Sequence, residues 1–408
     1  MDTTRWDELL PLVRRAVPEG EIAELLRSLV RIPSHPQCEG LESRLAEFLA
    51  GFLRSEGLDV TVQPVVGVRH NVIARLKGAG HGRSLILHAH MDTVPPYRME
   101  IEPFEGIVQD GKLYGRGAVD VKGGLAAMVM AIVGLRRAGI ALRGDVILTA
   151  VVDEEFRGEG TEALVLSGLK ADGAIVAEPT SLRLCRGHRG LEWLEITVKG
   201  VAVHSGTREK GVNAISKAAR LVVALEQRLT PKLASRTDPF LGPPTINVGY
   251  ICGGFQPSTV AESCLIKLDR RTTPLESTAL VWKDFHELFD QLAQEDPEFT
   301  AEIRRMPESQ AKLDHLAFVT PPDHPLVRCL EGAISATGLT PQHAPFPAWS
   351  DAGFLAVHGA IPSVVLGPGD LSVAHSALEW VSLEEVVAAT QLYALAAMEF
   401  CGTVDQSS

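Results

Sequence analysis

The hydrophobic positions of this 408-residue chain change their spacing along its length, and the spacing predicts which segments form helices and which form strands. From Leu25 to Leu53, apolar residues recur every three or four positions, which predicts helices. Gly57 follows them and can adopt the left-handed conformation common at helix ends. Continuous apolar runs, typical of buried strands, then alternate with helical segments such as LAAMVMAIVGLRRAG. These runs are NVIARL, SLILHAH, DVILTAVVD and GAIVAEP.

The pattern changes near Gly190. In LEWLEITV the apolar residues at 194, 196 and 198 alternate with polar ones, which is typical of a strand with one exposed face. Further alternating segments (TINVGYI, SCLIKLD, FTAEIRR) and two helical ones (NAISKAARLVVALEQRL, LVWKDFHELFDQLAQ) predict a small α+β unit that ends near Met306. The earlier pattern of buried strands and helices then returns and continues to the C-terminal helix LEEVVAATQLYALAAMEF.

These segments predict an α/β fold in which a mostly buried sheet is flanked by helices and interrupted by a smaller inserted α+β domain. We assign residues 1–187 and 307–408 to the sheet domain and residues 188–306 to the insert.

Composition narrows the class of protein. The chain is 45% hydrophobic, enough for sizeable cores, and its formal net charge of −12 argues against nucleic acid or an anionic membrane as a partner. The six cysteines are scattered without a Cys-x-x-Cys pair, which predicts reduced thiols. The N-terminus lacks the features of a secretory signal, and we expect no membrane span. A cytoplasmic protein is therefore predicted.

Several strand ends carry acidic or imidazole side chains. A single histidine there is usually hydrogen-bonded and structural, and a single aspartate is usually a helix cap. Together they put many carboxylates at the ends of apolar strands, where an unpaired buried charge costs several kcal/mol or more. Divalent cations remove that cost. The residues are His90, Asp92, Asp120, Glu154, Glu155, Glu178 and His375.

This set contains imidazoles and carboxylates without thiolates, so it suits zinc, cobalt or manganese better than a structural thiolate site. It is large enough for two metal ions, with Asp120 able to bridge them. Such a pair would acidify a water molecule and polarise a carbonyl group. One of Glu154 and Glu155 would bind metal, and the other would act as general base.

The segments HAHMDTVP, GRGAVDVKGG, DEE and EPT, with the late AH, resemble in order those of a dinuclear zinc peptidase and deacylase family. This family includes acetylornithine deacetylase, succinyl-diaminopimelate desuccinylase, aminoacylase and glutamate carboxypeptidase. The resemblance covers nearly the whole chain and places the insert at the family's lid and dimerisation domain. His88 matches no ligand of the family, so we expect it to be structural.

The resemblance implies a role for each site residue. It implies that His90, Asp120 and Glu178 hold one metal ion; that Asp120, Glu155 and His375 hold the other; that Asp92 orients His90; and that Glu154 is the general base and acid.

The same resemblance suggests substrate contacts. KGVAVHSGTREKGVNAI is similar to the family's lid segment, in which a histidine, here His204, crosses a dimer interface and stabilises the oxyanion. In LDRRTTP the resemblance assigns Arg271 to the substrate carboxylate, although an arginine beside Arg270 on a sheet is equally compatible with a solvated face. Gly369 in LGPGDL would let the backbone approach a ligand. Ser258, where relatives usually have asparagine, would be a further substrate contact.

The predicted function is a homodimeric, metal-dependent hydrolase that cleaves the amide bond of a small N-acyl amino acid or related amide with a carboxylate. Two divalent ions, zinc or else cobalt or manganese, would be its cofactors. The first alternative is a metallo-exopeptidase. The second is a non-catalytic metal-binding protein on the same scaffold, against which the spare carboxylate of Glu154 argues. The chain has no Gly-x-Ser-x-Gly segment, which disfavours a serine hydrolase.

Overall fold

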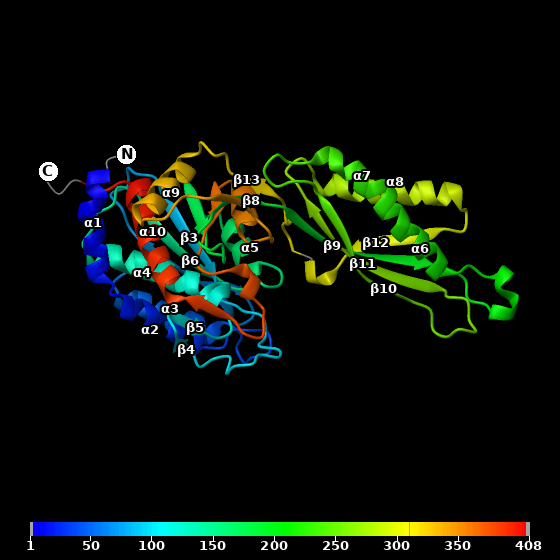
Figure 1. Ribbon diagram of the computed structural model, residues 1–408, viewed down its shortest axis with the longest axis horizontal. Coiled ribbons are helices and arrows are strands. Elements are labelled where there is room, and N and C mark those ends of the chain that lie inside the picture. The colour runs from blue at the N-terminus through cyan, green and yellow to red at the C-terminus, as the bar shows by residue number, and fades with distance from the viewer. Residues whose placement is uncertain (1–2, 310, 405–408) are drawn as a thin grey trace. The chain divides into compact units, whose positions relative to one another are not determined.

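The computed structural model describes residues 3–309 and 311–404 and divides them between two compact units (Figure 1). The first unit contains the chain up to Gly187, Thr320–Phe346 and the part from Ser350 onward. The second contains His188–Val319 and Pro347–Trp349. The second unit thus includes the range predicted for the insert, 188–306, together with residues 307–319.

A mixed sheet forms the centre of the first unit. Within this unit its strand order is β1-β2-β6-β3-β7-β15-β8, and β14 also pairs with β8. The three central strands β6, β3 and β7 run parallel to one another, whereas β1 and β2 are antiparallel. The strands are β1 (Asp59–Val66), β2 (Arg69–Leu76), β3 (Leu85–His90), β6 (Val146–Val151), β7 (Gly173–Val176), β8 (Leu184–His188), β14 (His343–Phe346) and β15 (Ser363–Val365).

Helices surround this sheet, as the apolar runs of its central strands require. They are α1 (Thr3–Ala16), α2 (Glu19–Val30), α3 (Ser43–Ser55), α4 (Gly123–Arg137), α5 (Glu159–Leu166), α9 (Pro325–Ala336) and α10 (Leu383–Cys401). A π-helical turn, η1 (Ala118–Lys122), leads into α4. The predicted α/β fold, with a buried sheet between helices, is confirmed.

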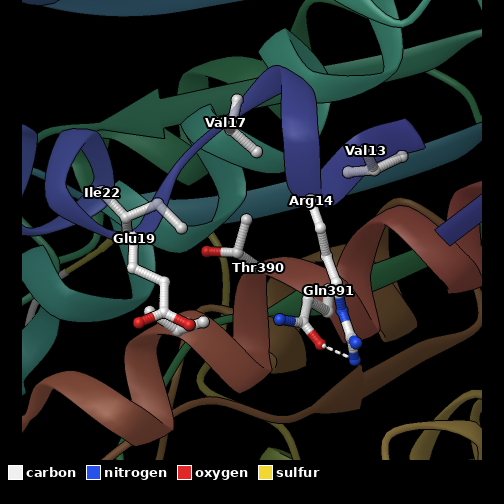
Figure 2. A pocket seen from close by; sticks show the side chains of 8 residues that line it. Val13, Arg14, Val17, Glu19, Ile22, Thr390 and Gln391 are labelled. Carbon is white, nitrogen blue, oxygen red and sulfur yellow. Dashed lines mark hydrogen bonds between the residues drawn. The ribbon is translucent and has the colours of Figure 1, made fainter. Parts of the chain in front are cut away.

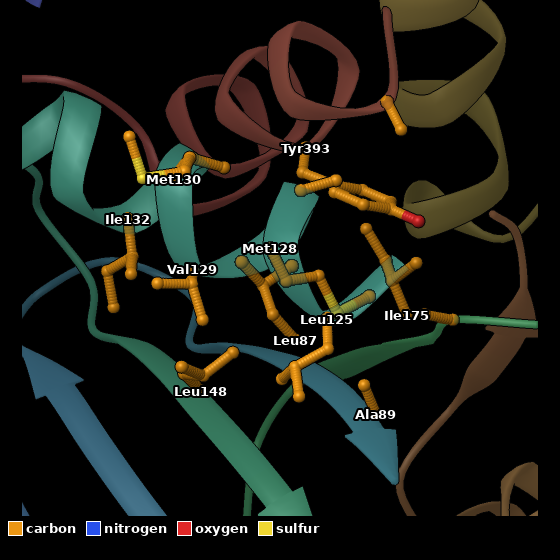
Figure 3. Close-up of a cluster of buried hydrophobic side chains, with 14 of the residues drawn as sticks. Leu87, Ala89, Leu125, Met128, Val129, Met130, Ile132, Leu148, Ile175 and Tyr393 are labelled. Atoms are coloured by element: carbon orange, nitrogen blue, oxygen red, sulfur yellow. The ribbon is translucent and has the colours of Figure 1, made fainter. Parts of the chain in front are cut away.

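One face of the central strands forms the main core with α4 and α10 (Figure 3). Leu87 and Leu148 belong to β3 and β6, while Leu125 and Met128 belong to α4, and all four are buried. Strand alternation sends the neighbouring side chains His88 and Thr149 to the opposite face. The sheet is therefore apolar toward α4 and carries polar groups on its other side.

The continuous helical stretch Ala118–Arg137 is long and apolar enough to cross a membrane by length and composition. Its apolar window is entirely buried inside the protein, which is the position of a core helix.

The second unit has its own sheet and its own core. The strand order is β10-β11-β9-β12, all antiparallel, and β10 lies at one edge. The strands are β9 (Gly190–Lys199), β10 (Thr245–Gly253), β11 (Ser263–Thr272) and β12 (Thr300–Arg305), and the helices are α6 (Ala214–Ala224), α7 (Thr230–Leu233) and α8 (Thr278–Glu295). Leu194, Ile196 and Val198 of β9 are fully buried against these helices, as their alternation predicts.

Short strands make up the rest. A three-stranded sheet, in the order β16-β5-β4, contains β4 (Ile107–Gln109), β5 (Lys112–Tyr114) and β16 (Trp380–Ser382), and β13 covers Phe318–Val319. The hydrophobic pattern did not predict these strands, because two or three residues are too few to show a period.

The core shown in Figure 3 supports the strand that ends at His90, which makes its packing testable. We expect Leu87→Ala to lower the free energy of unfolding of the first unit by about 2–5 kcal/mol, since it leaves a cavity beneath α4. Leu166→Ala on α5 is the control, because Leu166 is 57% exposed and its loss should change stability by under about 0.5 kcal/mol. Urea unfolding followed by circular dichroism measures both, and equal losses would contradict the packing described.

Candidate metal centre

Three neighbouring parallel strands bring most of the predicted residues to one edge of the sheet. His90 is the last residue of β3, Glu154 and Glu155 follow β6, and Glu178 follows β7. Because β6, β3 and β7 are adjacent and parallel, their carboxyl ends lie at the same edge, where open α/β sheets place ligand sites. The apolar runs that predict these strands therefore also position the acidic groups.

The side chains form two groups that share Asp120. Asp120 Oδ1 lies 3.2 Å from His90 Nε2, and Asp120 Oδ2 lies 3.1 Å from His375 Nε2. On the first side, Glu178 Oε1 is 4.0 Å from His90 Nε2. On the second side, Glu155 Oε2 is 3.1 Å from His375 Nε2. Asp120 thus points one oxygen at each imidazole, as a bridging carboxylate would.

Glu154 lies with the first group. Ligand-capable atoms of His90, Glu154 and Glu178 fall within 4.8 Å of one another, and those of Asp120, Glu155 and His375 do the same. By position alone, Glu154 is a candidate ligand as well as a candidate base.

Asp92 supports this centre differently from the expected way. His90 Nδ1 makes its hydrogen bond to the main-chain carbonyl of Asp92, at 2.9 Å, and the nearest carboxylate oxygen of Asp92 is 3.7 Å away. The carboxylate instead accepts the backbone N–H groups of Glu154 and Glu155, at 3.1 and 3.0 Å. Asp92 therefore orients His90 through its backbone and holds the two glutamates through its side chain.

Glu379 holds the backbone at Asp120 in the same way, and the sequence analysis did not single out this residue. Its buried carboxylate accepts the backbone N–H groups of Val119 and Asp120, at 3.1 and 3.3 Å, while Arg116 donates to the other oxygen at 2.5 Å. The signal that could have found Glu379 is an acidic residue four positions after His375, within an apolar context.

Gly369 lies in the same region and has a positive φ of 89°. A Cβ atom at Gly369 would lie 2.2 Å from a methyl carbon of Val119, the residue before Asp120. Close packing beneath Asp120 accounts for this glycine.

Burial, together with the repulsion among the carboxylates, controls the electrostatics of the centre. Burial and the charge of Glu178 raise the pKa of Glu154 well above its ordinary value, and burial and the charge of Asp120 do the same for Glu178. Burial also raises the pKa of Asp92 to about 7. Hydrogen bonds to Asp120 and Glu155 raise the pKa of His375 to about 10. The clustered carboxylates therefore hold protons or attract cations.

These residues fit divalent metal ions. All the donor atoms are carboxylate oxygens or imidazole nitrogens, which zinc, cobalt and manganese accept. Among the described residues, Glu178 Oε1 is also buried without a hydrogen-bond partner, a costly state that a cation would relieve.

His88 lies beneath the centre on the same strand as His90 and belongs to neither ligand group. Its Nδ1 is 2.8 Å from the Thr149 hydroxyl, and its Nε2 is 3.1 Å from Asp351 Oδ2, which also accepts a hydrogen bond from Thr161. The buried imidazole links β3 to β6, α5 and the segment after β14.

The remaining predicted residues belong to the second unit. His204 is exposed and accepts the N–H of Gly206 at Nδ1, and the Ser205 N–H donates to the Ser258 carbonyl at 2.9 Å, so His204 and Ser258 are neighbours. Arg271 donates to both carboxylate oxygens of Asp269, at 2.8 and 3.0 Å.

Sequence reasoning did not single out Arg189, whose pKa is lowered by burial and by the charge of Arg271. Two guanidinium groups thus lie near one carboxylate, Asp269, which makes this part of the second unit locally cationic.

A separate pocket lies between α1, α2 and α10 (Figure 2). Val13, Val17 and Ile22 line it, and Arg14 donates to Gln391 at 2.7 Å across its mouth. It contains no member of the two ligand groups.

Carboxylates and imidazoles gathered in two groups at the carboxyl edge of an α/β sheet are typical of hydrolases that use metal ions. The chain belongs to peptidase family M20/M25/M40, whose model matches residues 86–399. It is 33% identical over 336 residues to an acetylornithine deacetylase from Myxococcus xanthus, covering 81% of this chain and 84% of the relative.

Two further comparisons agree. The chain is 30% identical over 405 residues to an N-formyl-4-amino-5-aminomethyl-2-methylpyrimidine deformylase from Bacillus subtilis, covering 91% of this chain and 92% of the relative. Its fold resembles that of a dinuclear metal-binding M20 peptidase from Bacillus subtilis, with a TM-score of 0.71 and 17% identity over 95% of this chain and 99% of the other. The predicted family and the prediction of an enzyme that hydrolyses amide bonds are confirmed.

The raised pKa of His375 makes metal binding depend on pH. In the metal-free protein this imidazole stays protonated up to about pH 10, so a metal ion must displace its proton. We expect zinc binding at pH 7.5 to release protons, and metal affinity to rise with pH toward that value. Calorimetry in two buffers of different ionisation enthalpy counts the protons, and Asp120→Asn, which removes one charge beside His375, should reduce the number. Binding without proton release would contradict this view of the centre.

Proposed function

We propose that the protein is a metal-dependent deacylase that hydrolyses the amide bond of a small N-acyl amino acid or a related amide carrying a carboxylate. The observation that carries the proposal is the placement of Asp120, whose two oxygens point at His90 and His375. Each imidazole has a further carboxylate beside it. This supports two metal sites, with His90, Asp120 and Glu178 at one and Asp120, Glu155 and His375 at the other.

Two metal ions held there would polarise the amide carbonyl and acidify a water molecule. Glu154 takes the proton from that water and delivers it to the leaving nitrogen. Glu155 is already engaged by His375 and by the N–H of Val94, at 3.3 Å, which leaves Glu154 as the base of the pair. Burial raises the pKa of Glu154 toward the neutral range, and a carboxyl group with such a pKa can accept a proton in one step and return it in the next near neutral pH.

Residues of the second unit recognise the substrate in this proposal. Arg271 binds the substrate carboxylate, and the cationic surroundings that it forms with Arg189 support this role. His204 stabilises the oxyanion, and Ser258, its neighbour, contacts the substrate. Gly369 would act on this site through the close packing that it allows against Val119, because its N–H already donates to Glu385 and its carbonyl already accepts from Ser181. The deacetylase and deformylase names of the relatives favour a small acyl group.

A metallo-exopeptidase is the second candidate. The specific observation in its favour is the fold similarity to a dinuclear metal-binding peptidase. Both reactions cleave an amide with the same groups, so the substrate alone distinguishes them.

The proposal extends to assembly, metal and location. Strand β10 is an edge strand, and Tyr250, Ile251 and Phe255 on or beside it are 48%, 50% and 93% exposed. An apolar, unpaired edge is suited to pairing with a second copy, which supports a homodimer through the second unit. Zinc is the proposed metal. All six cysteines are free, in keeping with a cytoplasmic protein.

The first experiment is a hydrolysis screen. Metal-stripped protein resupplied with zinc, cobalt or manganese should hydrolyse at least one of a panel of N-acetyl, N-formyl and N-succinyl amino acids and dipeptides. Glu154→Gln should retain its metal content yet lose at least about 100-fold in kcat, because the proton acceptor is gone. Glu159→Gln, on α5 nearby, is the matched control and should keep full activity. The proposal would be overturned if the protein bound two metal ions and hydrolysed no compound of the panel.

The dimer gives a second test. We expect Ile251→Lys to produce a monomer in sedimentation experiments and to lower kcat, because His204 then cannot reach a second subunit. Val66→Lys is the control, since Val66 is similarly exposed, at 46%, but lies on β1 of the first unit.

Mixing His204→Ala with Glu154→Gln subunits should restore activity in hybrids that carry one native site. Verified hybrids without activity would rule out this sharing.

A further inference from the structure

The turn after β6 carries Glu154 and Glu155, which are consecutive in the sequence. Asp153, the residue before them, has a φ of 71°, and its carbonyl oxygen accepts the backbone N–H groups of Phe156, Arg157 and Gly158, at 3.4, 3.1 and 2.6 Å. The position of Asp153 therefore sets the path of the whole turn.

A largely buried arginine, Arg69, holds Asp153. Arg69, the first residue of β2, donates from one terminal nitrogen to Asp153 Oδ1 at 2.6 Å. The other edge of its guanidinium donates to Glu42. Nε lies 2.8 Å from one carboxylate oxygen of Glu42, and the second terminal nitrogen donates to the other carboxylate oxygen. The side chains of Arg69, Asp153 and Glu42 are only 14%, 6% and 1% exposed, so solvent screens these contacts weakly.

The turn is held from its other side by Asp92, which accepts the N–H groups of Glu154 and Glu155. Asp92, Asp153 and Glu42 are all buried. Three buried acids thus surround the turn, and Arg69 is the cation that bonds directly to two of them. Its planar fork can contact both at once, which a lysine ammonium cannot do with the same geometry.

We propose that Arg69 is a positioning residue for the reaction: by clamping Asp153 against Glu42, it holds the turn that carries Glu154 and Glu155 in its working geometry. This inference rests on the proposed roles of those two glutamates. Arg69 touches neither substrate nor metal ligand in this account, and it acts through Asp153.

The test compares two arginines of one strand. Arg75 lies six residues after Arg69 on β2, hence on the same face, and pairs with Asp145 at 2.5 Å, at the end of the strand remote from the turn. We expect Arg69→Lys to lower kcat about 10- to 100-fold with KM changed by less than about 3-fold, because small displacements of reacting groups are costly. Arg75→Lys should leave both constants unchanged. Asp153→Asn should reproduce the Arg69→Lys loss, and the double variant should add little to either single one.

A second readout does not depend on activity. In metal-free protein, hydrogen exchange of the amides from Glu154 to Gly158 should quicken in Arg69→Lys and stay unchanged in Arg75→Lys, while exchange in α4 is the same in all three proteins. The inference would be overturned if the turn in Arg69→Lys exchanged its amide hydrogens at the wild-type rate. It would also be overturned if exchange in this variant became faster evenly throughout the first unit. If the wild-type enzyme turned over no amide, the proposed function would fail, and the exchange data would still decide whether Arg69 holds the turn.

Discussion

The burial of several carboxylates side by side is the constraint on which the rest of the structure depends. Five carboxylates converge on one edge of the central sheet, together with the imidazoles of His90 and His375; they belong to Asp92, Asp120, Glu154, Glu155 and Glu178. Water cannot screen these charges fully, so the free energy of the folded state depends on protons or cations at this edge. A protein without a use for such a cluster has no physical reason to keep it.

Two carboxylates, one within the cluster and one beside it, hold the cluster in place, and they act in the same manner. Asp92 accepts two consecutive backbone N–H groups at Glu154 and Glu155, and Glu379 accepts two at Val119 and Asp120. Each has a guanidinium group associated with its side of the centre: Arg116 bonds directly to Glu379, and Arg69 bonds to Asp153 within the turn that Asp92 caps. Backbone dipoles and arginines thus fix side chains that would otherwise move apart.

The sequence predicts which site residues lie at the carboxyl edge of the sheet, but it does not predict the long-range contacts of Arg69 and Glu379 that hold them there. His90, Glu154, Glu155 and Glu178 follow apolar runs directly, so a local pattern is enough to place them at strand ends. Asp120, on the turn before α4, and His375, in the late AH segment, were candidates by residue type, and the ordered family motifs then assigned them to the two metal ions. The pairing of Arg69 with Asp153 joins residues 84 positions apart, and that of Glu379 with Asp120 joins residues 259 apart. No local pattern encodes such contacts. Strand β1 was also missed, because most of its residues are exposed or half-exposed and it has no continuous apolar run.

The chain is divided into two units, each with its own hydrophobic core. This division separates the residues that would bind metal ions from the residues that would contact the substrate. The candidate metal ligands lie wholly in the first unit, where binding a metal ion would require strict geometry. The proposed substrate contacts His204, Ser258 and Arg271 lie in the second, supported by the packing of β9 and β11 against α6 and α8. Substitutions such as serine for the usual asparagine at Ser258 change a surface supported by a different core. Substrate preference can therefore change while the amide-cleaving centre stays intact, which is why the reaction is easier to infer from this chain than its substrate.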